Sequence, residues 1–167
     1  MKAISSPRKT QKPGNRSVRG KIQPKPRRIW AWMLLILYST AVVYWMFIGF
    51  GRVVHPDGPL QYNLEPLRTI KLYFDLDNGV PFSGRLVNLL GNVAVFIPFG
   101  LLLPLLKKRL NSMFGLTLHM ALWILLLESM QMLLRVGSFD IDDLLLNLLG
   151  VWIGYIFLHL AWGKSLN

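Results

Sequence analysis

The sequence contains no cysteine and few charged residues. Without a thiol, the chain can form neither a disulfide nor a thiolate metal site, and the redox compartment cannot be read from it. Charged residues make up 16% of the 167 residues, whereas a soluble domain carries about a quarter. Hydrophobic residues make up 53% and come in long blocks, which is typical of a membrane protein.

Acidic residues are absent from residues 1–28, which carry ten lysines and arginines and four prolines. Such a segment cannot bury apolar surface, so we expect a disordered basic tail. We favour a cytoplasmic tail that sets topology and contacts anionic lipid headgroups over an arm that binds nucleic acid. A cleaved signal peptide is disfavoured, because the hydrophobic run that follows has about twenty residues and no small-x-small cleavage site comes after it.

Four hydrophobic runs are long enough to cross a membrane. They comprise residues 29–50, 86–106, 113–134 and 141–162. At about 1.5 Å per residue, some twenty residues of helix cross the roughly 30 Å of hydrocarbon. A helix is the only open-ended structure that satisfies its own backbone there. The predicted fold class is therefore an all-α membrane protein, a four-helix transmembrane bundle.

The loop between the first two runs is too long for a simple turn. Within it, Leu67, Ile70 and Phe74 fall on one side of a helix, with Arg68 and Lys71 off that side. This pattern predicts a short amphipathic interfacial helix lying on the outer leaflet.

Lysine and arginine in the short flanks predict the orientation. The tail has ten, the loop after the second run has three, and Lys164 follows the fourth run. On the other side, the long loop balances four basic with four acidic residues, and the last loop has only Arg135. The positive-inside rule then predicts that both termini are cytoplasmic.

Polar residues gather at the predicted outer ends of the second, third and fourth spans. At about 100° per residue, those on each span fall on one helix face, whereas Asp142 points away from Asp143 and is left out. The candidate binding residues are Asn88, Asn92, Glu128, Gln131, Arg135, Asp140, Asp143 and Asn147. Gly91, Gly150 and Gly154 would let the backbones approach closely.

Three of these residues lie at similar depth. Asn92, Glu128 and Asn147 each fall roughly 10 Å inside a span at about 1.5 Å per residue. Facing lipid there, such a side chain would cost a few kcal/mol, so we expect them to face one another. The result would be a polar pocket open to the outside.

Structural alternatives exist for several of these side chains. Asp140 and Asp143 could be an N-cap and a capping-box acid, and Arg135 could be a cation at the end of a helix dipole. Glu128 and Asn147 are too deep for capping, although amides in membrane bundles often serve only to join helices. His119 and His159 lie toward the inner side, where histidines are more often interfacial residues than ligands. Carboxylates suit Mg²⁺ or Ca²⁺, but no spacing here specifies a metal or a cofactor.

Ordered motifs run through about residues 60–155. They are Asn63-Leu-Glu-Pro66, then Asn92 before Phe96-x-Pro98-x-Gly100, then Glu128-x-x-Gln131, and finally Asp140-x-x-Asp143-x-x-x-Asn147-x-x-Gly150. In this order and spacing they resemble the VanZ-like family of small bacterial membrane proteins. The resemblance implies a bacterial plasma-membrane protein associated with teicoplanin-type glycopeptide susceptibility, with no settled reaction. The basic tail is not part of the pattern.

Three functions are open at this point. The pocket could bind a lipid headgroup or a lipid-linked envelope intermediate, with membrane lipids or envelope proteins as partners. Alternatively, an enzyme could act on a phospholipid or polyprenyl-linked substrate, with Glu128 as general base assisted by Asp140 and Asp143. The third is a small transporter or assembly subunit. No recognisable nucleophile, phosphate loop or zinc motif supports the enzyme, and no polar continuation to the inner side supports the transporter.

Overall fold

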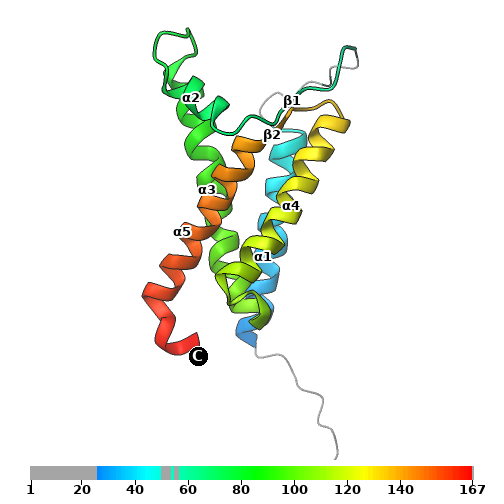
Figure 1. The fold of residues 1–167 in the computed structure, drawn as a ribbon. Coiled ribbons are helices and arrows are strands. Elements are labelled where there is room, and N and C mark those ends of the chain that lie inside the picture. The colour runs from blue at the N-terminus through cyan, green and yellow to red at the C-terminus, as the bar shows by residue number, and fades with distance from the viewer. Residues whose placement is uncertain (1–25, 50–53, 55–56, 167) are drawn as a thin grey trace, which may run out of the picture.

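In the computed structural model, which describes residues 26–49, 54 and 57–166, four long helices make up most of the structure (Figure 1). They are α1 (Pro26–Phe47), α3 (Phe82–Leu106), α4 (Met113–Leu133) and α5 (Ile141–Leu166). Each contains an apolar segment long enough to cross a membrane. The predicted all-α class with four spans is therefore confirmed. Most of the predicted tail, residues 1–25, lies outside the described residues.

The bounds of three helices, α1, α3 and α5, differ from the predicted spans by three residues or more. α1 includes residues 26–28, assigned to the tail, and ends at Phe47 instead of residue 50; α5 continues to Leu166. α3 begins at Phe82, four residues before the predicted start, so that it includes Arg85, which the prediction counted in the loop. In the structure Arg85 is buried in the first turn of α3, where neighbouring backbone carbonyls satisfy its guanidinium group.

The start of α1 and the end of α5 lie at one end of the bundle (Figure 1). We call the opposite end, formed by residues 57–81 and 134–140, the loop end. It contains the short helix α2 (Arg68–Phe74) and two parallel two-residue strands, β1 (Tyr62–Asn63) and β2 (Phe139–Asp140). α2 confirms the short helix predicted between the first two spans, and its position on the outer leaflet stays a prediction.

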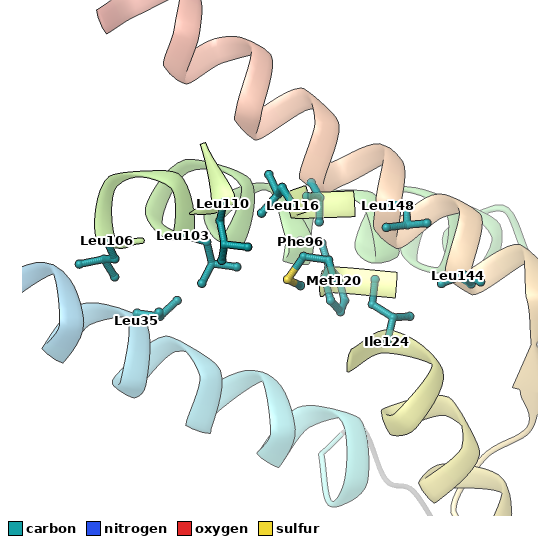
Figure 2. Close-up of a cluster of buried hydrophobic side chains, with 11 residues drawn as sticks. Leu35, Phe96, Leu103, Leu106, Leu110, Leu116, Met120, Ile124, Leu144 and Leu148 are labelled. Atoms are coloured by element: carbon teal, nitrogen blue, oxygen red, sulfur yellow. The ribbon is translucent and has the colours of Figure 1, made fainter. Parts of the chain in front are cut away.

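The described apolar core is shared unevenly among the long helices (Figure 2). Its fully buried members include Leu116 and Ile124 of α4 and Val151 of α5. From α1, only Leu35 joins this cluster among the described residues. α1 is thus the most weakly embedded of the four long helices.

Glycines bring α3 and α5 into backbone contact. A Cβ atom added to Gly100, Gly150 or Gly154 would overlap a backbone carbonyl oxygen of the opposite helix. Gly91 was predicted to share this role, and that prediction is wrong: a Cβ there would meet nothing within 4 Å among the described residues. Gly100, about two and a half turns further along α3, faces α5 instead. Small residues at such a seam allow the close packing that holds membrane helices together.

Candidate functional site

Asp142 fastens α2 to the start of α5. Its side chain is 0% exposed. Its carboxylate accepts hydrogen bonds from the backbone N–H groups of Leu67 (2.5 Å), Thr69 (2.8 Å) and Ile70 (3.1 Å). It therefore satisfies the free donors of the first turn of α2 from another helix. Asp142 was not among the predicted site residues, because it points away from Asp143 on the helix, and in the structure that direction faces the start of α2.

Asp140 holds the same loop from a neighbouring position. Its Oδ1 accepts from Asn63 Nδ2 (3.0 Å) and from the backbone N–H of Asp142 (2.9 Å), and its Oδ2 accepts from Thr69 Oγ1 (2.5 Å). The bond to Asp142 confirms that Asp140 caps α5. Asn63 and Thr69 were not predicted as site residues, although Asn63 begins one of the ordered motifs.

Arg85 anchors the segment that follows α2. Its guanidinium group donates to Val80 O (2.8 Å), Tyr73 O (2.9 Å) and Asn78 Oδ1 (2.6 Å), and also to Asp75 O. With 4% of its surface exposed, this arginine is satisfied almost entirely by one loop. The loop end is thus fixed to α5 by carboxylates and to α3 by a guanidinium group.

A cavity of about 490 Å³ lies at the loop end, and we call it the polar cavity. Five of the eight candidate residues line it: Asn88, Gln131, Arg135, Asp140 and Asp143. They come from α3, α4, α5 and the α4–α5 connection, so the bundle brings together residues that are far apart in the sequence. Tyr73 and Thr69 of α2 complete one wall.

The other three candidates, Asn92, Glu128 and Asn147, lie further into the bundle and point inward. Glu128 is 3% and Asn147 is 1% exposed, and Asn92 Nδ2 donates to Asp143 Oδ1 across α3 and α5 (2.5 Å). Asn147 Oδ1 has no hydrogen-bond partner among the residues that the structure describes. These amides and this carboxyl group avoid the lipid-facing surface, as their depth predicted.

Arg135 carries the only positive charge among the described residues that line the polar cavity. It follows the last turn of α4 in the left-handed conformation (φ 57°), and its Nη1 donates to Gly58 O (2.6 Å). Glycine is the usual residue in this conformation at a helix end, and a side chain there is strained. Arg135 is therefore a cation held at a fixed place on the cavity wall.

The cavity contains both donors and acceptors. Burial, and then the charges of Asp143 and Asp140, raise the pKa of Tyr73, whose phenol stays a neutral donor. Of the candidate catalytic residues, Asp140 is engaged by three donors and Asp143 by Asn92. Within the described ranges, no three His, Cys, Asp or Glu side chains are grouped to hold a metal ion. The arrangement is suited to holding a polar, charged group.

The model of the VanZ/LLP1 family matches residues 29–162, which include most of each long helix and the whole loop end. No curated protein and no solved structure matches the chain.

Proposed function

Since the chain belongs to the VanZ/LLP1 family and has four apolar helices, it is a multi-pass membrane protein, and we propose that its polar cavity binds the headgroup of a lipid or of a lipid-linked envelope intermediate. The position of the cavity carries this proposal. Asn88 lies six residues after the start of α3, about 9 Å along the helix, so the cavity lies where the apolar segments end. Lipid headgroups lie at this level of a bilayer.

The charges on the cavity wall fit a phosphate-bearing headgroup. Arg135 offers a planar guanidinium group, which binds phosphate oxygens in pairs. Asp143 and Asp57, which also line the cavity, can accept from an amine or a hydroxyl group. The left-handed backbone of Arg135 adds support, because a strained residue that glycine could replace at lower energy is often retained for its side chain.

That strain allows a test that separates binding from folding. Arg135→Gly removes the cation at a backbone position that glycine prefers, so the fold should be at least as stable. Native mass spectrometry of the purified protein in lipid should show phospholipid or polyprenyl-phosphate adducts, reduced at least about ten-fold in Arg135→Gly, because a charged hydrogen bond contributes about 1.5–3 kcal/mol. Arg109→Gln, at the other end of the bundle, is the control. Wild-type protein without adducts, or equal adducts in all three proteins, would overturn the proposal.

We also propose that the chain lies in the bacterial plasma membrane with both termini cytoplasmic, which places the polar cavity at the outer face. The absence of cysteine makes single-cysteine variants informative. In intact cells, a membrane-impermeant maleimide should label Ser138→Cys at the loop end and spare Lys108→Cys near the start of α4, with both labelled after lysis. The reverse pattern would invert the orientation.

The last part of the proposal is that cavity occupancy affects susceptibility to teicoplanin-type glycopeptides. Glu128→Ala and Asn147→Ala, both buried beneath the cavity, should insert normally and lose any resistance phenotype. Full resistance from a stably expressed double variant would contradict this. Glu128→Gln keeps the shape and removes the general base, so an unchanged phenotype in that variant would eliminate the enzyme alternative while leaving headgroup binding in place.

A further inference from the structure

A second cavity, of about 270 Å³, lies between α1, α3 and α4, away from the polar cavity, and we call it the apolar groove. Its lining includes the buried side chains of Val42, Phe96 and Met120, and the exposed side chains of Val43 and Trp123. Of the described residues that line it, nine are apolar and the other two are Ser39 and His119. A buried floor with exposed lining residues beside it indicates a groove open to its surroundings.

The groove lies between α1 and the two helices to which α1 is hydrogen-bonded. α1 is joined to α3 by the hydrogen bond from Tyr38 Oη to Val95 O (2.8 Å) and to α4 by the bond from Gln131 Nε2 to Met46 O (2.7 Å). Beside these bonds the facing side chains leave a hollow, whereas the glycines bring the backbones of α3 and α5 into contact. Packed interiors rarely leave such a volume empty.

The apolar groove and the polar cavity are neighbours along α4. Leu127 lines the groove, and Gln131, one helical turn or about 6 Å further on, lines the polar cavity. On α1, Val43 lines the groove, and Met46 provides the carbonyl that Gln131 binds. A molecule that is polar at one end and apolar below would therefore meet a matching surface at both depths.

Building on the proposed headgroup function, we propose that the apolar groove seats one hydrocarbon chain of the lipid whose headgroup binds in the polar cavity. Hydrocarbon chains surround the protein at this depth. Filling the hollow with a chain supplies the dispersion contacts that its lining otherwise lacks. The volume is below the roughly 300–1,000 Å³ of typical ligand pockets, which suits a single slender chain.

Photo-crosslinking tests this assignment. Phospholipids carrying a diazirine at mid-chain are incorporated with the protein in nanodiscs, irradiated, and the labelled peptides are mapped by mass spectrometry. Met120 and Leu127 in the groove should be labelled at least three-fold more than Leu118 and Leu122, which are exposed on α4. Equal labelling of the two sets would overturn the proposal. A dimer in which a second copy of the chain occupies the groove and excludes the labelled lipid would overturn it as well.

Filling the groove provides the matched comparison. Leu127→Trp should lower groove labelling at least three-fold, whereas Leu122→Trp on the exposed face of α4 should leave it unchanged. Val43→Trp fills the same space from α1, and so serves if Leu127→Trp does not fold. Groove labelling that persists in the folded filled variants would contradict the assignment.

The same assay separates this inference from the headgroup proposal. If one lipid occupies both places, Arg135→Gly should lower both the adducts and the groove labelling. Loss of adducts with unchanged groove labelling would overturn the one-lipid assignment and leave headgroup binding in place. Groove labelling without any adducts in the wild type would instead overturn the headgroup proposal, and with it this inference.

Discussion

The seam between α3 and α5 and the seam between α1 and α4 differ in how they are closed. At the first, glycines bring the two backbones together, and 33% of each span is buried. At the second, one hydrogen bond lies above a groove, and 11% of the α1 span is buried. At the dense seam, Asn92, which lies beneath the polar cavity, donates to Asp143 on the cavity wall. The open seam is the side from which a lipid chain can approach.

Breaking the dense seam should have the largest effect. Gly150→Leu places a side chain where even a Cβ would overlap the carbonyl of Val93, so we expect a loss of about 3 kcal/mol or more, or failure to fold. Thermal unfolding in detergent, followed by circular dichroism, measures this. Gly91→Ala is the control, and it should be neutral or slightly stabilising, because that helical glycine faces open space. Equal losses in both variants would mean that the seam is not closed by these glycines.

Removing the carboxylate of Asp142 should have the next largest effect, confined to the loop end. In Asp142→Ala, the partly buried N–H groups of Thr69 and Ile70 lose their acceptor, at about 2 kcal/mol of local stability. Hydrogen exchange of these two amides should accelerate, while exchange along α3 stays unchanged. Asp77→Ala, an exposed acid on the same loop, is the control. Protection unchanged by Asp142→Ala would contradict the capping role.

Loosening the open seam should have a smaller effect. Gln131→Leu removes the bond to Met46 O, and interhelical hydrogen bonds in membranes contribute about 0.6 to 1.7 kcal/mol. Ser129→Ala is the control. The hydroxyl group of Ser129 donates to a carbonyl within α4, so its removal should change stability less. Chemical crosslinking between α1 and α4 should slow in Gln131→Leu alone. If Gln131→Leu lost as much stability as Gly150→Leu, the two seams would contribute equally to the stability of the fold.

The smallest expected effect concerns pH. The pKa of Tyr73 is raised in the folded protein, chiefly by burial, so the unfolded chain ionises first as the pH rises. The stabilising contribution is therefore present below about pH 10 and is lost as the pH rises through the folded pKa. Stability should fall in this alkaline range less steeply for Tyr73→Phe than for the wild type. Identical slopes would show that Tyr73 does not contribute.

The sequence predicts the four spans well, because apolar runs of membrane-crossing length have few alternatives. It also predicts which deep amides and acids point inward, because lipid penalises the opposite orientation. It misses Asp142 and Arg85, because their partners are mostly backbone groups of α2 and of the segment that follows it, and a pattern of side chains does not show which backbone groups need a partner. It selects Gly91 and not Gly100, because helix crossing points depend on packing angles that the pattern of one span does not contain.

A cryo-electron microscopy structure of the protein in nanodiscs made from a bacterial total-lipid extract tests the central claim most directly. The account predicts headgroup density beside Arg135 in the polar cavity, continuing past Gln131 into the apolar groove. A polar cavity holding only water, with ordered lipid confined to the outer surfaces of the helices, would contradict it.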